Sequence, residues 1–283
     1  MRSIELAAHA KINLSLLIKY RRPDGFHEIE SVFQEIDWGD DLFLQEAEGY
    51  TFETNSILLR EEVDNLCLKA AKLMGHECNI PGLYIRLIKR IPLGAGLGGG
   101  SSDAAAVLKG INVIYNLKLH GADLIALAAK LGSDIPFFIN GGSAFVYGRG
   151  ELIQPVEIDT NYTLILIHPE VSISTAWAYA NLKMGLTKAF IKTKFIGFEV
   201  QNLSVENFRD KFSNDFEKSL FAAYPQLADC KQMLYGSGAD FACMSGSGST
   251  IYGLFRDDRQ ARSVYQELKT RFSCTLTRPV KRK

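Results

Sequence analysis

The sequence predicts an α+β fold made of two compact lobes. Segments with strand periodicity and segments with helix periodicity follow one another without the regular strand–helix–strand order of a parallel sheet. With 47% hydrophobic and 23% charged residues, the composition is that of a globular protein. A single core usually stops growing at about 250–300 residues, so a chain of 283 residues favours two lobes. Gly150 and Pro155 punctuate the chain near the expected boundary, which gives lobes over residues 1–155 and 156–283.

The N-terminal segment predicts a long strand over residues 4–18, because apolar and polar side chains alternate there with a period of two. The Arg-Pro-Asp-Gly sequence at 22–25 is typical of a turn. Two further strands are expected over 26–36 and 42–46. The Trp-Gly-Asp sequence at 38–40 is expected to separate them.

The first helix is expected over residues 65–74, with Asp64 or Asn65 as its N-terminal cap and Gly75 as its end. The remaining strands are expected at 83–91, 143–147, 163–167, 241–244, 250–255 and 274–277. The remaining helices are expected at 101–116, 122–131, 174–184, 214–222, 225–235 and 259–272.

Charge and composition exclude several classes of function. Lys plus Arg and Asp plus Glu are both 32, so the chain has no global field for nucleic acid or an anionic membrane. No apolar run reaches the roughly 20 residues that span a bilayer. The five cysteines are scattered without a CxxC pair, which indicates reduced thiols. We expect a cytoplasmic protein that acts on a small molecule, as a monomer or a weak homodimer, with no nucleic-acid or membrane partner.

A glycine-rich loop with the sequence PLGAGLGGGSSD spans residues 92–103 and lies between a predicted strand and an Ala-rich helix. Its glycines lack the Cβ atoms that would keep a ligand away from the backbone. Main-chain N–H groups at the start of a helix attract anions, and the hydroxyls of Ser101 and Ser102 can bind phosphate oxygens or Mg²⁺. The alternative is a plain turn with a serine cap, which needs only one or two glycines. Five occur here, namely Gly94, Gly96, Gly98, Gly99 and Gly100.

The loop does not match the common phosphate-binding motifs. A Walker A motif needs a lysine before the final Ser or Thr, and none is present. A G-x-G-x-x-G match at residues 94–99 is weak, because no carboxylate follows near residues 115–120 as a dinucleotide fold requires. Protein-kinase signatures such as HRD and DFG are also missing. The loop is therefore a phosphate cradle of another kind.

Four segments resemble, in the expected order, the small-molecule kinase superfamily named after galacto-, homoserine, mevalonate and phosphomevalonate kinases (GHMP). They are AHAKINLSL with RRPDGFHEIESVFQEIDWGD, PLGAGLGGGSSDAA, LGSDIPFFINGGSAFVYGRGE and FACMSGSGSTIYGLF. Together they are most similar to the branch that phosphorylates a cytidylyl-linked sugar alcohol in non-mevalonate isoprenoid synthesis. The resemblance covers both halves, although residues 180–235 are not distinctive.

The resemblance implies a fold with a ribosomal-protein-S5-domain-2-like N-terminal lobe and a ferredoxin-like C-terminal lobe, with the active site in the cleft between them. It implies ATP and Mg²⁺ as cofactors. It also implies catalytic roles for Lys11 and Asp134 at the acceptor hydroxyl. A lysine on a strand face can instead be a solvated surface charge, and Asp134 can simply initiate a turn before Pro136.

The same resemblance implies two binding sites. The residues expected to bind ATP are Asn65, Leu66, Pro92, Leu93, Gly94, Ala95, Gly96, Leu97, Gly98, Gly99, Gly100, Ser101 and Ser102. The residues expected to bind the cytidylyl substrate are Asn13, Phe26, His27, Thr175, Tyr179, Gly246 and Ser247. Candidate magnesium ligands, besides ATP itself, are Ser101, Ser102 and Asp134. The family more often has Tyr at position 26, so the hydrogen bond of that hydroxyl is absent here.

Two alternatives remain open from the sequence. The first is another GHMP kinase, of the homoserine or mevalonate type, although DGFHEIES and SISTAWAY resemble the cytidine-binding branch. The second is a nucleotide-binding sensor without catalytic activity. The presence of both Lys11 and Asp134 argues against a sensor, because such a protein could lose them and still bind ATP.

Overall fold

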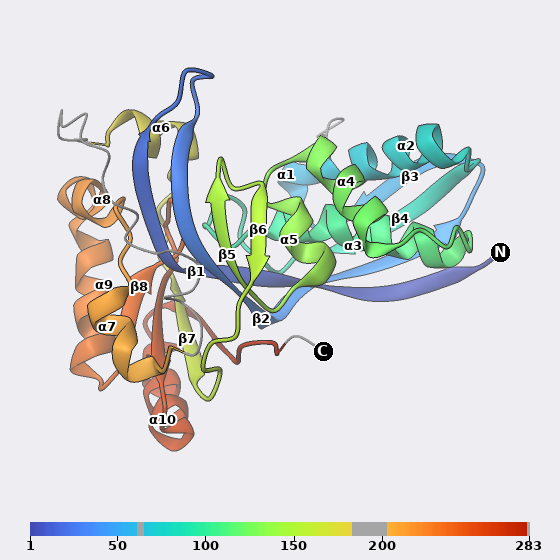
Figure 1. The fold of residues 1–283 in the computed structure, drawn as a ribbon. Helices are drawn as coiled ribbons and strands as arrows, with labels where there is room; N and C mark the ends of the chain where they lie inside the picture. Colours follow the sequence, from blue (N-terminus) through green and yellow to red (C-terminus); the bar gives the residue numbers. More distant parts are fainter. Residues whose placement is uncertain (61–64, 183–202, 282–283) are drawn as a thin grey trace. The chain divides into compact units, whose positions relative to one another are not determined.

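The computed structural model describes residues 1–60, 65–182 and 203–281 (Figure 1). The chain forms two compact units built from interleaved segments. Unit 1 contains Met1–Ala10, Trp38–Leu93 and Gly98–Gly141, and unit 2 contains Lys11–Asp37, Gly94–Leu97 and Gly142–Lys283. The long strands β1 (Ser3–Arg21) and β2 (His27–Glu46) contribute to both units. The predicted α+β class is confirmed, and the division of the sequence at residue 155 stays a prediction.

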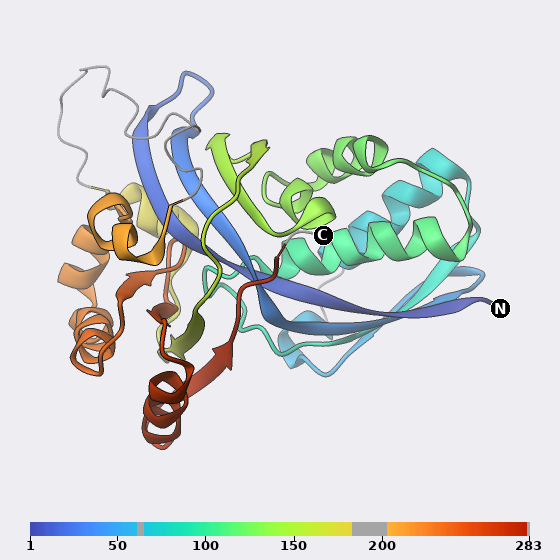
Figure 2. The same ribbon diagram turned by 60° about the horizontal axis from the view of Figure 1, so that its bottom comes forward.

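Unit 1 is a sheet with helices packed on one face (Figure 2). Strand β4 (Gly82–Ile88) pairs in parallel with β3 (Gly49–Thr54) and antiparallel with the second half of β2, where Asp41 lies opposite Ile88. Apolar side chains of these strands, including Leu44 and Ile85, are fully buried. The helices are α1 (Ile57–Arg60), α2 (Leu66–Cys78), α3 (Gly99–Ile114), α4 (Gly121–Leu131) and α5 (Ile135–Asn140).

Unit 2 holds the first half of β2 paired with β5 (Ser143–Gly148), which in turn pairs with β6 (Leu152–Pro155). A separate antiparallel sheet has the order β10–β7–β9–β8. Its strands are β7 (Thr163–His168), β8 (Phe241–Met244), β9 (Ile251–Phe255) and β10 (Ser273–Thr277). The helices are α6 (Thr175–Ala180), the 3₁₀ helix η2 (Val205–Asn207), α7 (Phe208–Lys211), α8 (Glu217–Ala223), α9 (Pro225–Gly236) and α10 (Asp258–Leu268).

Two predicted breaks in unit 1 are wrong, and both fall at glycines. β2 continues through residues 38–40, because Gly39 lies so close to β1 that a Cβ there would come within 2.1 Å of the carbonyl oxygen of Ala8. Helix α2 continues past Gly75 and ends at Asn79, which has a left-handed conformation. A Cβ at Gly75 would lie 1.9 Å from the hydroxyl oxygen of Tyr50. Each glycine therefore permits a close approach and does not end its element.

The other predicted elements agree with the structure apart from their ends. The strand over 4–18 is confirmed within β1, and the helix over 259–272 ends earlier, at Leu268. Asn65 caps α2 by accepting a hydrogen bond from the N–H of Leu68, whereas Asp64 lies outside the described residues, as do residues 183–184 of the helix expected over 174–184. The short elements β3, α1, α5, β6, η2 and α7 were not predicted.

The cysteine and membrane predictions can also be compared with the structure. All five cysteines are free thiols, as predicted, and Cys67, Cys230 and Cys243 are buried. Within the described parts of the chain, no helix combines the length and the apolar character needed to cross a membrane.

Candidate active site

Lys11 lies on β1 in unit 2 and is buried, with only 4% of its surface exposed. Its ammonium nitrogen donates to Oδ1 of Asn13 at 2.5 Å and lies 4.3 Å from the ring centroid of Phe33. Removing an ammonium group from water is costly unless it is paired. Its burial excludes a solvated surface charge, which was the alternative for Lys11.

Asn13 is also buried, and its side chain forms hydrogen bonds to Lys11 and to Ser31 on β2. The amide nitrogen Nδ2 donates to Oγ of Ser31 at 2.9 Å, and the hydroxyl of Ser31 donates to the carbonyl oxygen of Ser15 at 2.5 Å. Because Oδ1 and Nδ2 cannot be exchanged without breaking these bonds, the network fixes the oxygen of Asn13 toward Lys11.

The first half of the glycine-rich loop, Gly94–Leu97, belongs to unit 2 together with Lys11. The main-chain N–H of Lys11 donates to the carbonyl oxygen of Leu97 at 3.0 Å. The hydroxyl of Ser245 donates to the carbonyl oxygen of Gly96 at 2.8 Å. Gly96 has a φ of +78°, and a Cβ there would lie 2.1 Å from the carbonyl oxygen of Ser245. Glycine is therefore required at this position by conformation and by space.

A second loop rich in glycine and serine, residues 245–249 (the glycine–serine loop), contacts the glycine-rich loop within unit 2. The hydroxyl oxygen of Ser245 accepts from the main-chain N–H of Asn13 at 3.2 Å. The side-chain nitrogen of Asn214 donates to the carbonyl oxygens of Met244 and Gly246, each at 2.8 Å. Asn214 was not predicted as a site residue, because the only sequence signal is a Ser-Asn-Asp triplet that resembles an ordinary helix start.

The second half of the glycine-rich loop begins α3 in unit 1. Gly98 occupies the N-cap position with a φ of +68°, and no side chain caps the helix there. The first main-chain N–H groups of a helix need partners from outside the helix. An uncapped start of a 16-residue helix after three left-handed glycines, Gly94, Gly96 and Gly98, fits an anion such as a nucleotide phosphate.

Asn65 and Leu66 lie at the start of α2, in the same unit as the start of α3. A Cβ on Gly100 would lie 3.6 Å from Cδ1 of Leu66, so this leucine borders the first turn of α3. The structure thus brings together two segments, about 35 residues apart, that were both expected to bind ATP. Asn65 itself is buried, and its side-chain oxygen is used to cap α2.

Asp134 occupies the N-cap position of α5 in unit 1, and it is half-buried. Its side chain makes no capping hydrogen bond to α5. Capping of the following turn was the alternative to a catalytic role, and the geometry of α5 gives that alternative no support. Since Lys11 belongs to unit 2 and Asp134 to unit 1, their pairing at the acceptor hydroxyl stays a prediction.

The residues expected to bind cytidine gather in unit 2. The rings of His27 and Tyr179 stack with centroids 4.7 Å apart and planes inclined by 21°. Burial, with help from Arg21, lowers the pKa of His27, which favours a neutral ring for stacking. The hydroxyls of Thr175 and Ser247 lie 3.0 Å apart. These pairs join α6 to the start of β2 and to the glycine–serine loop.

Phe26 is more exposed than its neighbour His27. More than half of its surface is exposed, and the guanidinium carbon of Arg149 lies 5.1 Å from its ring centroid. An exposed aromatic ring beside a cation can make a further stacking contact. Phe26 lacks the hydroxyl group of the more usual Tyr, but its exposed ring is compatible with stacking.

Two family models match parts of this chain. The family model "GHMP kinases N terminal domain" matches residues 65–142, and "GHMP kinases C terminal" matches residues 199–274. The chain belongs to the GHMP kinase family. A 4-diphosphocytidyl-2-C-methyl-D-erythritol kinase of Chlorobium phaeobacteroides (strain BS1) is 38% identical over 281 residues, covering 99% of this chain and 98% of the relative. The enzyme of the same name from Thermodesulfovibrio yellowstonii (strain ATCC 51303 / DSM 11347 / YP87) is 39% identical over 282 residues, covering 97% and 98%.

Solved structures agree with this membership of the GHMP kinases. A crystal structure of 4-(cytidine 5'-diphospho)-2C-methyl-D-erythritol kinase matches with a TM-score of 0.81 and 30% identity, over 98% of this chain and 99% of that one. A homoserine kinase from Cytophaga hutchinsonii matches with a TM-score of 0.70 and 21% identity, over 100% of this chain and 96% of that one. At that identity the second match supports the GHMP kinase fold alone.

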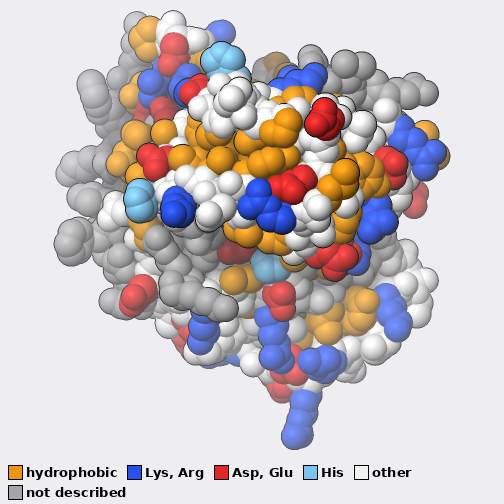
Figure 3. All heavy atoms as spheres, turned by 90° about the vertical axis from the view of Figure 1, so that its right-hand side faces the viewer, with side chains coloured by type: hydrophobic (Ala, Val, Ile, Leu, Met, Phe, Trp, Pro, Cys, Tyr) orange, Lys and Arg blue, Asp and Glu red, His pale blue; other side chains and the backbone are white. Residues whose placement is uncertain are grey.

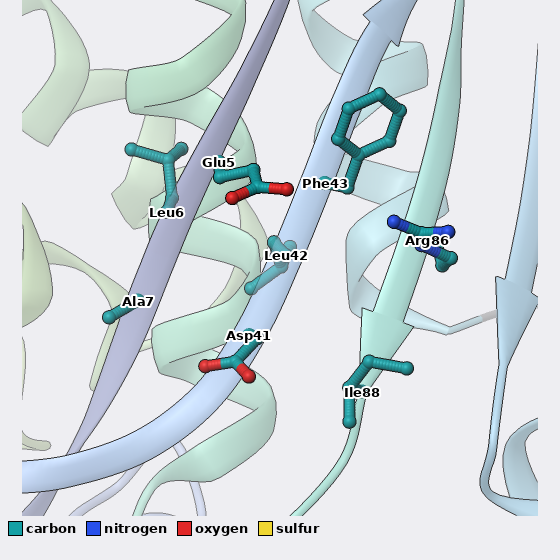
Figure 4. Close-up of a pocket in the computed structure, with 8 residues that line it drawn as sticks. All are labelled: Glu5, Leu6, Ala7, Asp41, Leu42, Phe43, Arg86 and Ile88. Atoms are coloured by element: carbon teal, nitrogen blue, oxygen red, sulfur yellow. The ribbon is translucent and has the colours of Figure 1, made fainter.

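A separate pocket of this GHMP kinase lies in unit 1, on strands β1, β2 and β4 (Figure 4). None of the residues expected to bind ATP or the cytidylyl substrate lines it, so it is not part of the candidate site. The pocket is lined by Glu5, Leu6, Ala7, Asp41, Leu42, Phe43, Arg86 and Ile88.

On the face drawn in Figure 3, basic and acidic side chains are interspersed around a hydrophobic patch, in keeping with the zero net charge.

Proposed function

We propose that this GHMP kinase phosphorylates the 2-hydroxyl of 4-diphosphocytidyl-2-C-methyl-D-erythritol with ATP. The products are the 2-phosphate and ADP, in the non-mevalonate (methylerythritol phosphate) pathway of isoprenoid synthesis. The observation that carries the proposal is the near-complete coverage at 38% identity with an enzyme of that name. The stack of His27 on Tyr179 supports it, because a flat aromatic surface suits a pyrimidine base.

The nucleotide part of the site is the glycine-rich loop. As a GHMP kinase, the protein uses ATP. We propose that the main-chain N–H groups at the start of α3 bind its phosphates and that Asn65 and Leu66 border the base. The uncapped N-terminus at Gly98 supports phosphate binding, and the position of Leu66 beside Gly100 supports the second contact.

Lys11 and Asp134 are the proposed catalytic residues. Phosphoryl transfer depends mainly on positioning and on stabilising charge on the transferring group. The buried ammonium of Lys11, held by Asn13, is suited to stabilise that charge or the charge that develops on the acceptor oxygen. The carboxylate of Asp134 would accept the proton of the 2-hydroxyl or orient that hydroxyl for in-line attack.

Mg²⁺ is part of this proposal, since hard oxygen ligands and nucleotide phosphates are its usual partners. The oxygen donors at the start of α3 are the hydroxyls of Ser101, which is half-buried, and Ser102, which is buried. Asp134 is the third candidate ligand. The ion would supply charge neutralisation on the phosphates.

The test is an ADP-release assay with three acceptors, namely the cytidylyl substrate, homoserine and mevalonate. Only the cytidylyl substrate should support ADP release well above the rate without acceptor. Release with homoserine or mevalonate instead would favour another GHMP kinase. ATP binding without release in all three arms would favour the nucleotide sensor. The His27–Tyr179 stack supports the cytidylyl substrate over the other two acceptors.

A further inference from the structure

Ser31 lies on β2 in unit 2, beside the side chains that hold Lys11, and no predicted role accounts for it. Side chains two residues apart on a strand share a face. Lys11 and Asn13 form such a pair on β1, and Ser31 and Phe33 form one on β2. The pairs meet, because the ammonium of Lys11 lies over the Phe33 ring and the amide nitrogen of Asn13 donates to Ser31. All four residues are at most 4% exposed.

The hydroxyl of Ser31 decides which end of the Asn13 amide faces Lys11. A serine hydroxyl has one donor hydrogen and two acceptor lone pairs. The hydrogen of Ser31 is donated to the main-chain carbonyl oxygen of Ser15 at 2.5 Å. Toward Asn13, at 2.9 Å, the hydroxyl can therefore only accept. The part of the amide that faces Ser31 must be its NH₂ group, which leaves the oxygen Oδ1 on the other side.

Lys11 needs this orientation of the amide. An ammonium group has three donor hydrogens and no acceptor, so its partner must be an acceptor. Nζ of Lys11 donates to Oδ1 of Asn13 at 2.5 Å. With the amide turned by 180°, an NH₂ group would face the ammonium, and a hydrogen bond would become a contact between two donors. In a buried site water does not replace the lost partner, so the ammonium would move away from Asn13.

We infer that Ser31 is a positioning residue for phosphoryl transfer, which acts through Asn13 on the ammonium of Lys11. The inference rests on the catalytic role proposed for Lys11. Phosphoryl transfer depends on a positive charge placed where negative charge develops. A displaced ammonium should therefore lower the rate of transfer while both substrates still bind. With 1% of its surface exposed, Ser31 is suited to act through its neighbours and not by contact with the substrate.

The test is the single-turnover rate of Ser31→Ala, which removes only the hydroxyl. Loss of a hydrogen bond to a charged group corresponds to about a 10–100-fold change in rate, so transfer should slow by that factor. The Kd values of ATP and the acceptor should stay within about threefold of the wild type. Ser31→Thr keeps the hydroxyl and should keep the rate within about threefold. Ser31→Cys keeps the size but has only a weak donor and acceptor, so it should be as slow as Ser31→Ala and replaces it if that variant does not fold.

A double-mutant cycle with Asn13→Ala separates positioning from a merely structural role. Without the Asn13 amide, Ser31 has nothing to orient. Adding Ser31→Ala to Asn13→Ala should then change the rate by less than about twofold. Ser143→Ala is the matched control, because Ser143 is a buried serine on the neighbouring strand β5 whose hydroxyl donates to Oε1 of Gln34 at 2.6 Å. It should lose stability, as Ser31→Ala does, and keep the rate of transfer.

The inference is wrong if Ser31→Ala transfers at the wild-type rate, if a folded Ser31→Thr is as slow as Ser31→Ala, or if the effects of Ser31→Ala and Asn13→Ala multiply. An equal fall in Ser143→Ala would also overturn it, since damage to the sheet would then explain the result. Lys11→Met identifies a failure of the proposed mechanism, because a wild-type rate in that variant removes the role of Lys11. A slow Lys11→Met with a fast Ser31→Ala overturns the inference alone. The acceptor is whichever of the three supports ADP release by the wild type.

Discussion

The side-chain amide of Asn214 holds the carbonyl oxygen of Gly246 at 2.8 Å, and the same nitrogen donates to Met244. Gly246 has a φ of +57°, and a Cβ there would lie 3.2 Å from the main chain of Gly96. Asn214 therefore fixes the shape of one glycine-containing loop where it packs against the other. A residue distant from both loops in the sequence determines how they meet.

Asn214→Ala should destabilise the protein and distort the glycine–serine loop. Two buried carbonyl groups would lose their donor, which costs about 1–3 kcal/mol for each unsatisfied group. Chemical denaturation measures the stability, and substrate titration measures the loop. Asn181→Ala is the control, because the amide of Asn181 makes an exposed hydrogen bond to Trp177, and it should change stability by less than about 0.5 kcal/mol. Equal effects of the two substitutions would contradict this role.

Gly98→Val should weaken ATP binding strongly, because a branched side chain would occupy the space where phosphates approach the backbone. The φ of +68° at Gly98 also adds strain, of about 1–2 kcal/mol. Gly49→Val separates the two effects, since Gly49 has a φ of +85° and open space around its Cβ position. It should lose similar stability and keep its ATP affinity. Circular dichroism checks the fold, and nucleotide titration measures binding.

Tyr179→Ala should raise KM for the cytidylyl substrate by about tenfold or more and leave KM for ATP nearly unchanged, because one base–aromatic stack is worth about 1–3 kcal/mol. Steady-state kinetics with each substrate varied in turn measures both constants. Trp177→Ala, on the same helix, is the control for damage to α6, since the Trp177 ring contacts Tyr224. If only the ATP constant changed, Tyr179 would not be a cytosine contact.

His168 makes stability depend on pH. Burial lowers its pKa from 6.5 to about 4, and both ring nitrogens contact the hydroxyls of Thr250 and Thr275. Its native pKa is below the unfolded value, so its stabilising contribution is complete above pH 6.5 and declines as the pH falls toward 4. The loss should reach about 2–3 kcal/mol. Urea unfolding at pH 7 and 4.5 should show a smaller decrease for His168→Gln, and an equal decrease would exclude His168 as the cause.

Much of the fold could be predicted from local patterns. The period of two gave β1, and the period of helices gave α2, α3, α4 and α9 to within a few residues at most ends. The errors at Gly39 and Gly75 have one physical cause. Glycine was interpreted as a local break, whereas here each makes room for a distant main-chain or side-chain atom. That information lies in tertiary contacts and not in the neighbouring residues.

In the candidate site, too, local sequence patterns predicted some features and missed those that depend on tertiary contacts. Motif spacing identified the segments of Lys11, the glycine-rich loop and the glycine–serine loop, and within unit 2 these segments are hydrogen-bonded to one another. The role of Asn214 and the buried ion pair of Asp103 with Lys89 could not be predicted, because the partners are distant in the sequence. A single Asp in an Ala-rich helix gives no sign that it shares a buried lysine.

The most direct test of the proposed mechanism is the single-turnover rate of Asp134→Asn with both substrates bound. The amide keeps the size and shape of the side chain, so stability should change little. We predict that phosphoryl transfer slows by about 10²–10⁴-fold while both Kd values stay close to those of the wild type. A variant that transfers the phosphoryl group within a few-fold of the wild-type rate would contradict the assignment of Asp134 to the acceptor hydroxyl.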